Sequence, residues 1–181
     1  AMKEINYYYN PKHPLHPYIS QGYANMGSLS PLDALRIEPE FKRGFCPCEK
    51  GGVWTNVPDY RGVTVYDKKT AQPATIDDIG ELPDSVTTLA PDVDFPQWDG
   101  KKWVMDIQAR KADHIRQAEQ QKSSLRQRAD SAIAPLQDAV DLGMATDTEK
   151  AGLTEWRRYR VLLNRVDCTT APDVQWPEQP K

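Results

Sequence analysis

Hydrophobic and polar residues alternate along parts of the first hundred positions and follow a helical period in much of the rest. Residues 63–66, Val-Thr-Val-Tyr, show the period of two that is typical of a half-buried strand. Residues 53–57, before a turn that contains proline, and residues 74–76, after a second turn, fit two further short strands. We therefore predict a small β-meander in this part of the chain.

The first 50 residues combine tyrosines with prolines. Proline has no backbone N–H and clashes inside helices, so we expect at most short strands and turns here. Ser30 followed by Pro31 matches a helix start, because serine is a good N-cap and proline fits the first helical position. This pair predicts a short helix over Pro31–Ile37.

Residues 77–99 form an acidic segment with seven Asp or Glu residues and no Lys or Arg. Its prolines keep it extended, and we interpret it as a connector that runs over a surface. The segment leads into Trp98-Asp99-Gly100-Lys101-Lys102-Trp103, where Asp-Gly is a strong signal for a tight hairpin turn. The two tryptophans should therefore lie near one another across the turn.

A long helix is predicted from Asp106 to about Leu142, because good helix formers dominate a stretch without aromatic residues. Pro135 should kink it or mark its last turns. Its seam is thin, rich in small residues and interrupted by one charged position, Lys122. It comprises Ile115, Ala118, Lys122, Leu125, Ala129, Ala132, Leu136 and Ala139. So thin a seam needs a partner, and we expect either the next helix or a second copy of the chain to supply it.

A second helix follows a short loop. Gly143 is expected to end the long helix, and Thr146-Asp147-Thr148-Glu149 matches a capping box that opens the next one. The second helix should run to about Val166. Its apolar face comprises Leu153, Trp156, Tyr159, Leu163 and Val166. Two helices joined in this way form an antiparallel hairpin, and an extended tail comes after them.

The predicted fold class is α+β, with a small N-terminal β-meander domain followed by a long helix and helical hairpin. We expect an aromatic- and proline-rich β-domain at residues 1–103, including the acidic connector at about 77–99. The helical hairpin domain, with its extended C-terminal tail, should occupy residues 104–181.

The net charge argues against a nucleic-acid partner, and the hydropathy of the chain argues against membrane insertion. The 181 residues include 26 acidic and 23 basic side chains, a net charge of −3. This balance provides no general positive field, so we expect no nucleic-acid partner. No apolar run approaches the roughly 20 residues that cross a bilayer, and no signal pattern opens the chain. We therefore expect no membrane insertion and an intracellular location.

Catalytic and metal-binding motifs are not evident. Cys46 and Cys48, with His13 and His16, offer four soft ligands, but structural zinc sites usually place two to four residues between their cysteines and this pair has one. We interpret them as loop cysteines and surface histidines. No phosphate loop, nucleophile elbow or metalloprotease helix occurs. We expect no metal, no cofactor and no enzymatic activity.

The C-terminal third carries a more specific pattern. The stretches concerned are 133–139 (IAPLQDA), 155–167 (EWRRYRVLLNRVD) and 171–177 (APDVQWP). They closely resemble the tail fibre assembly proteins of tailed phages and prophages. The resemblance extends backward through residues 98–104, 89–91, 65–67 and 60–62, and covers about residues 55–180. The first 50 residues do not share it.

The resemblance implies a non-enzymatic chaperone. Such a protein would bind the C-terminal, receptor-binding region of the trimeric tail fibre and promote its folding and trimerisation. It would act in the cytoplasm of the bacterial host during phage assembly, and in some members of the family it stays on the fibre tip of the virion.

Our hypothesis divides this work between the two parts of the chain. The residues expected to contact the fibre are Tyr60, Tyr66, Trp98 and Trp103. The residues expected to stabilise the helical hairpin are Trp156, Tyr159 and Leu163. The helical part would then supply packing or self-association.

Two other functions stay open at this point. A carbohydrate-binding subunit at the fibre tip would use the same aromatic residues to recognise polysaccharide on the host surface, because tyrosine and tryptophan rings stack on sugars. A hydrolase or metal enzyme is the third class, and no catalytic constellation favours it.

Overall fold

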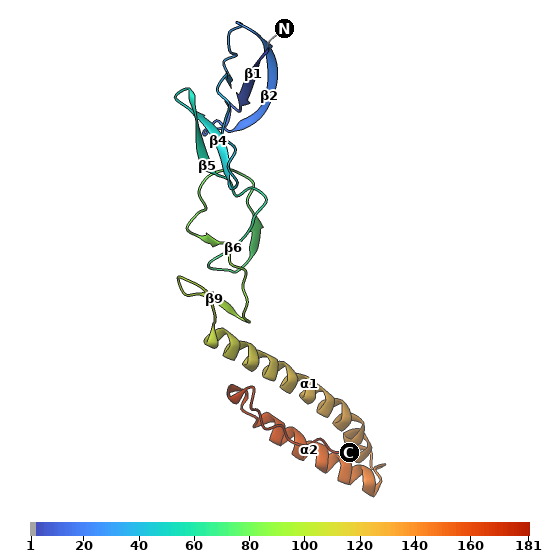
Figure 1. Cartoon of the computed structure of the whole chain (residues 1–181). Helices are drawn as coiled ribbons and strands as arrows, with labels where there is room; N and C mark the ends of the chain where they lie inside the picture. The colour runs from blue at the N-terminus through green and yellow to red at the C-terminus, as the bar shows by residue number, and fades with distance from the viewer. Residues whose placement is uncertain (1–2) are drawn as a thin grey trace. The chain divides into compact units, whose positions relative to one another are not determined.

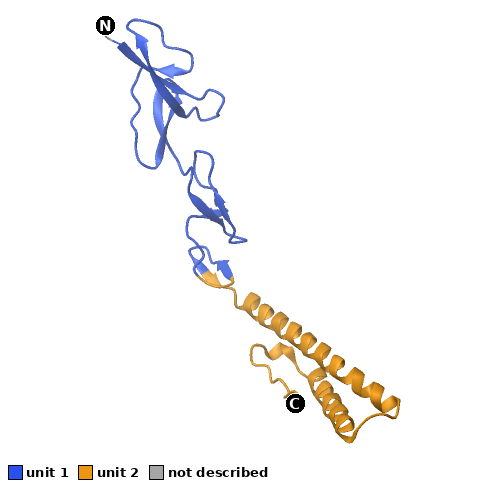
Figure 2. Ribbon diagram, turned by 90° about the vertical axis from the view of Figure 1, so that its right-hand side faces the viewer, with its two compact units in different colours: residues 1–92, 96–103 blue, residues 93–95, 104–181 orange. Residues whose placement is uncertain are grey.

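The computed structural model describes residues 3–181, which form small β-sheets followed by two α-helices (Figure 1). The chain divides into two compact units (Figure 2). The strand unit runs up to Asp92 and includes Pro96–Trp103, and the helical unit comprises Val93–Phe95 and Val104–Lys181. The predicted α+β fold class is confirmed. The predicted division into domains at residues 1–103 and 104–181 stays a prediction.

The first sheet has three antiparallel strands in the order β2-β1-β3. They are β1 (Lys3–Tyr9), β2 (Tyr18–Asn25) and β3 (Ala34–Leu35). β1 and β2 contain 7 and 8 residues, so the expectation of short strands at most was wrong here. The prolines that suggested it, at positions 11, 14 and 17, lie between β1 and β2 and leave both strands uninterrupted.

The short helix predicted over Pro31–Ile37 was also wrong, because this segment contains β3. The two residues of β3 pair with Tyr8 and Tyr7 of β1. The Ser30 hydroxyl donates to the carbonyl of Ala34 (2.7 Å) and does not cap a helix. Pairing with a strand more than twenty positions away therefore outweighs the local helix signal.

The predicted meander forms two further sheets. β4 pairs with β5, and β6 lies between β7 and β8. The strands are β4 (Phe45–Lys50), β5 (Val53–Pro58), β6 (Thr64–Asp67), β7 (Pro73–Thr75) and β8 (Val86–Thr87). Val65, in the middle of the alternating pattern, is only 1% exposed.

The acidic segment was expected to be a surface connector, but part of it is buried and part of it forms a strand. Its Ile79 packs in a buried cluster with Cys46 and Cys48, and β8 belongs to the same segment. The predicted turn at Asp99-Gly100 is confirmed: it joins β9 (Pro96–Trp98) to β10 (Trp103–Met105). Gly100 has φ 103°, a conformation that other residues rarely adopt.

The long helix α1 (Ile107–Asp141) contains Pro135 within its last turns, as predicted, and Gly143 follows its C-cap residue, Leu142. The N–H of Gly143 donates to the carbonyl of Val140 (3.1 Å), and the N–H of Met144 donates to that of Ala139 (2.8 Å). This pair of bonds satisfies the last carbonyls of a helix and requires a positive φ, here 70°.

The second helix α2 (Asp147–Asn164) opens with the predicted capping box. The Thr146 hydroxyl accepts from the N–H of Glu149 (3.1 Å), and the Glu149 carboxylate accepts from the N–H of Thr146 (3.0 Å). A 3₁₀-helix, η1 (Cys168–Thr170), follows, and the tail runs on from it.

Two buried clusters hold the helical unit together. The first comprises Ala118, Cys168 and Ala171, with Ile115, Val166, Val174 and Trp176 packed against it. The second comprises Ala129, Tyr159 and Leu163, with Leu125, Trp156, Val166 and Trp176 packed against it. α2 and the tail therefore cover the thin seam of α1, and pairing with a second copy stays a prediction.

The charged position of the seam also has a local partner. The Lys122 ammonium donates to the carbonyls of Val166 (2.8 Å) and Asn164 (3.4 Å) at the end of α2. A cation there complements the negative end of the helix dipole. Within residues 3–181, no helix is both long enough and apolar enough to cross a membrane.

Candidate interaction site

Trp98 and Trp103 form an aromatic pair on the hairpin of β9 and β10. Their ring centroids are 5.2 Å apart and their planes are inclined by 69°, an edge-to-face arrangement. Trp103 is 5% exposed, and its indole N–H donates to the carbonyl of Leu89 (2.8 Å). Trp98 is half-buried. Trp103 is therefore the buried ring of the pair, and Trp98 is the more accessible ring.

Lys68 places a positive charge on this accessible ring. Its ammonium lies 5.6 Å from the centroid of the Trp98 ring, within the range of a cation–π attraction. The backbone N–H of Lys68 donates to the carbonyl of Ser85 (2.9 Å), which fixes the residue that follows β6. The result is a surface that combines an aromatic ring with a cation.

The two tyrosines predicted to contact a partner lie elsewhere on the strand unit. Tyr66 is half-buried in β6, where it pairs with Pro73 and Thr87. Tyr60 is half-buried in the turn before β6. Among residues 3–181, the tryptophan pair is the only ring contact within the predicted set of four.

Two aspartates fix the turns beside these residues. The Asp99 carboxylate accepts from the N–H groups of Lys102 and Lys101 (2.8 Å each), and these bonds lower the pKa of Asp99. The Asp67 carboxylate accepts from the N–H of Lys69 (2.7 Å), and this bond lowers the pKa of Asp67. Both carboxylates are therefore charged at neutral pH and hold their loops in one conformation.

The interpretation of Cys46 and Cys48 as loop cysteines was wrong, because both are core residues of a strand. Cys46 and Cys48 are 4% and 2% exposed on β4. Burial raises the pKa of Cys46, and it raises the pKa of Cys48 to about 12. In the described part of the chain, no three His, Cys, Asp or Glu residues are grouped to hold a metal ion.

The histidines pair with carboxylates, which the sequence did not indicate. His13 Nε2 lies 2.7 Å from Asp78 Oδ1, and the N–H of Leu15 donates to His13 Nδ1 (3.0 Å). His16 Nδ1 lies 3.2 Å from Glu49 Oε2. These pairs tie the loop after β1 to β4 and to the acidic segment. The bond with His13 is also the main cause of the lowered pKa of Asp78.

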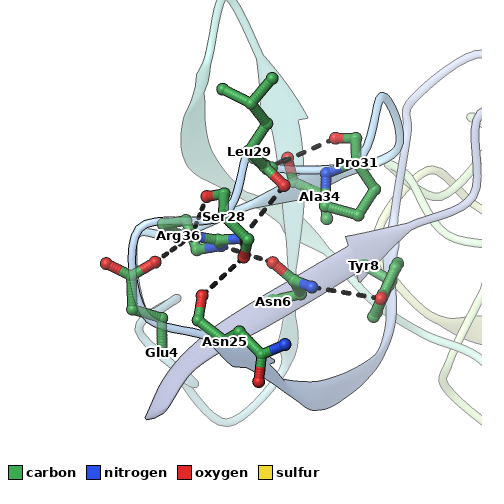
Figure 3. A network of polar contacts seen from close by, with 10 residues as sticks. Glu4, Asn6, Tyr8, Asn25, Ser28, Leu29, Pro31, Ala34 and Arg36 are labelled. Atoms are coloured by element: carbon green, nitrogen blue, oxygen red, sulfur yellow. Dashed lines mark hydrogen bonds and ion pairs between the residues drawn. The ribbon is translucent and has the colours of Figure 1, made fainter. Parts of the chain in front are cut away.

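A network of hydrogen bonds and an ion pair around Arg36 was likewise not predicted from the sequence. Arg36 Nε donates to Asn6 Oδ1 (2.5 Å), and the guanidinium forms an ion pair with Glu4 (Figure 3). The same guanidinium donates to the carbonyls of Ser28 (3.0 Å) and Leu29 (3.2 Å). One side chain therefore fixes the loop between β2 and β3 on β1.

The residues predicted to stabilise the helical hairpin lie on one face of α2. Tyr159 and Leu163 are 2% and 0% exposed, and both pack with Ala129 of α1. The rings of Trp156 and Tyr159 are 5.8 Å apart at 90°. This face of α2 is thus in the core of the helical unit and is not free for a partner.

Large apolar side chains are exposed on the first sheet and on the loop that Arg36 fixes. The exposed fractions are 57% for Ile19, 76% for Tyr23, 94% for Leu29 and 100% for Leu32. Exposed apolar groups that gather on one part of a molecule mark interaction surfaces. The N-terminal sheet thus joins the tryptophan hairpin as a candidate contact region.

Comparison with known proteins identifies related chains. Residues 61–181 match the family described as Caudovirales tail fibre assembly protein, lambda gpK. The chain is 51% identical over 127 residues to protein TfaD of Escherichia coli strain K12, a match that covers 70% of this chain and 68% of TfaD. It is 49% identical over 127 residues to the tail fiber assembly protein of Escherichia phage lambda, covering 70% of this chain and 66% of that protein.

A more distant relative is the prophage tail fiber assembly protein homolog TfaE of Escherichia coli strain K12, 36% identical over 143 residues. That match covers 77% of this chain and 72% of TfaE. No solved structure matches the chain. Because the family match spans more than half of the sequence, the chain belongs to the Caudovirales tail fibre assembly protein family, which has members in phages and prophages.

Proposed function

We propose that this protein is a tail fibre assembly chaperone. It binds the C-terminal, receptor-binding region of a phage tail fibre and promotes folding and trimerisation of that region. It acts without catalysis in the cytoplasm of the bacterial host. The family match over residues 61–181 carries the proposal, and the name of the lambda relative agrees with it.

The physical need for such a protein follows from β-sheet chemistry. A β-rich fibre tip exposes unpaired strand edges and apolar faces until three chains have joined, and such edges aggregate. A partner that offers strand edges and aromatic side chains covers these groups in the meantime. The strand unit contains both.

Three of the four aromatic residues predicted to contact the fibre remain part of the proposal: Tyr60, Tyr66 and Trp98. Trp103 is too deeply buried to offer much contact area, and its role is to position Trp98. Trp156, Tyr159 and Leu163 are used in the core of the helical unit. This unit supplies packing or self-association through its other surfaces.

Carbohydrate binding at the fibre tip is the alternative function. A sugar ring would stack on the accessible face of a tryptophan such as Trp98. The Lys68 ammonium already lies over the Trp98 ring, which disfavours sugar stacking on that face. Carbohydrate binding is accordingly the less favoured function, and the test below includes it as an outcome.

The experiment is co-expression of the C-terminal fragment of the tail fibre subunit from the same phage or prophage, with and without the full-length chain. We expect soluble trimers of the fragment only when the chain is present, measured by size-exclusion chromatography with light scattering. Equal yields of trimer without the chain would contradict the proposal. Binding of host polysaccharide by the chain alone would favour the alternative.

Trp98→Ala and Trp98→Phe form a matched pair for the contact surface. We expect the alanine variant to recover less complex and the phenylalanine variant to resemble the wild type, because phenylalanine keeps an aromatic ring against Trp103. Equal recovery with both variants would remove Trp98 from the contact surface and leave the chaperone function standing.

A further inference from the structure

β2 is an unusual edge strand. It lies at one edge of the first sheet and contains 8 residues, Tyr-Ile-Ser-Gln-Gly-Tyr-Ala-Asn, with neither a charge nor a proline. Edges of this kind pair readily with other strands, and proteins usually protect them with charges, prolines or short length. Every other edge strand within residues 3–181 is either at most 3 residues long or contains a proline.

The direction of the backbone groups of β2 follows from the register. The N–H of Tyr9 donates to the carbonyl of Asp33, so Tyr9 turns its backbone groups toward the β3 side of β1. Tyr7 and Ile5, two and four residues earlier, do the same because the direction alternates along a strand. Their cross-strand partners on β2 therefore turn their own N–H and C=O groups away from β1.

These partners are Gln21, opposite Tyr7, and Tyr23, opposite Ile5. Their outward backbone groups have no backbone partner among residues 3–181. On this side, the bridge between Pro17 and Cys48 lies immediately before β2. The free part of the edge therefore includes the outward N–H and C=O groups of two residues.

The side chains along this edge favour a partner strand as well. Ile19 and Tyr23 are 57% and 76% exposed, and the Lys3 ammonium lies 5.6 Å from the centroid of the Tyr23 ring. An extended strand that pairs with β2 would cover this apolar surface and satisfy the outward backbone groups at once. Because β2 is uncharged, the matching strand needs no complementary charge.

We propose that β2 binds an extended segment of the fibre subunit, which adds to the first sheet as a fourth, antiparallel or parallel strand next to β2. This inference rests on the proposed chaperone function and names the element that binds the client. β2 lies outside residues 61–181, the part of the chain that matches the family. The edge then adds a contact to the client outside the matched part.

The test compares Gln21→Pro with Gln21→Thr in the full-length chain. Proline removes the outward N–H of residue 21 and leaves the hydrogen bonds to β1, because an edge strand tolerates proline where its N–H faces solvent. Threonine keeps the N–H and the strand. The probe is the same C-terminal fragment of the tail fibre subunit, and the recovered complex is quantified after co-expression.

We expect Gln21→Pro to lower the recovered complex at least about tenfold, and Gln21→Thr to behave like the wild type. Circular dichroism and urea unfolding check that both variants fold. Wild-type recovery with a folded Gln21→Pro variant would overturn the proposal. If the wild type itself captures no fibre fragment, the proposed function fails and this inference fails with it.

Hydrogen exchange of the wild-type chain provides a measurement that does not depend on how the proline variant folds. The amides of Gln21 and Tyr23 should exchange fast in the free chain and become protected in the complex with the fibre fragment. Protection confined to other segments would overturn the role of β2 while leaving the chaperone function intact. Protection that appears at high chain concentration without fibre would assign the edge to a second copy, which also overturns it.

Discussion

Arg36 is the side chain that joins the first sheet to the loop between β2 and β3. Its guanidinium donates to Asn6 and to two loop carbonyls and pairs with Glu4 (Figure 3). Asn6 is 6% exposed, so loss of its charged donor leaves a buried polar group without this bond. We predict that Arg36→Ala lowers the free energy of unfolding by about 2 kcal/mol, measured by urea unfolding.

Arg36→Lys is the matched control for this prediction. Lysine keeps the positive charge but presents one ammonium where arginine presents a planar fork, so it cannot reach all four partners at once. We expect it to recover only part of the lost stability. Full recovery by lysine would mean that the charge alone matters, and an unchanged Arg36→Ala variant would contradict the role of the network.

The three cysteines, Cys46, Cys48 and Cys168, should be unreactive in the folded chain. Burial raises the pKa of each thiol, to about 12 for Cys48, and only the thiolate reacts with alkylating reagents. We predict slow modification by iodoacetamide at neutral pH and rapid modification of all three in urea, measured by mass spectrometry. Native-state modification of Cys48 as fast as in urea would show that β4 is not packed as described.

At the scale of single residues, sequence reasoning found contacts between neighbours and missed those between distant positions. It anticipated the approach of Trp98 and Trp103 because five positions and a tight turn separate them. It missed the bond from Arg36 to Asn6 because 30 positions separate the two residues and no local pattern joins them. It also missed the pairing of His13 with Asp78, which lie 65 positions apart.

At the scale of elements, the hairpin of β9 and β10 depends on the charge of Asp99. Backbone N–H groups of Lys102 and Lys101 lower the pKa of Asp99 below that of an unfolded chain. A lowered pKa in the folded state stabilises the fold above the unfolded pKa of about 4, and this contribution is lost as the pH falls through the folded pKa. The hairpin should therefore weaken in acid.

Asp99→Asn tests this dependence. Asparagine keeps an oxygen acceptor in the turn and removes the charge. We predict that the wild type is more stable than the variant at about pH 7 and that the difference shrinks toward about pH 3, as followed by tryptophan fluorescence during urea unfolding. A difference that stays constant over this range would mean that the ionised carboxylate contributes nothing to the turn.

Helix ends were predictable because their signals are local. The capping box at Thr146 and the turn at Gly143 each involve residues within a few positions of one another. The segment around Ser30 carries a similar local signal for a helix but forms β3, because Tyr7 and Tyr8 of β1 offer it a partner strand. Strand pairing depends on which distant segment is available, and local spacing does not contain that information.

At the scale of the whole molecule, each unit has at least one buried cluster made of its own residues. Leu163 is 0% exposed between α2 and α1, so Leu163→Ala should cost about 2 to 5 kcal/mol in the helical unit. We predict that hydrogen-exchange protection falls in α1 and α2 and is kept in the first sheet. Equal loss of protection in both units would show that they unfold together.

Leu162→Ala is the neighbouring control. Leu162 is 46% exposed, so the same truncation should cost about 1 kcal/mol or less. Similar costs for the two leucines would contradict the described packing of α2.

The tail that covers the helices determines the order in which the chain can fold during synthesis. Trp176 packs against both clusters of the helical unit, so the core of this unit is incomplete until the ribosome has made residues that come after both helices. The three strands of the first sheet, and the Arg36 side chain that fixes the loop between β2 and β3, all lie within residues 3–36. The nascent chain can therefore present β2 to a fibre subunit while its helical part is still being translated.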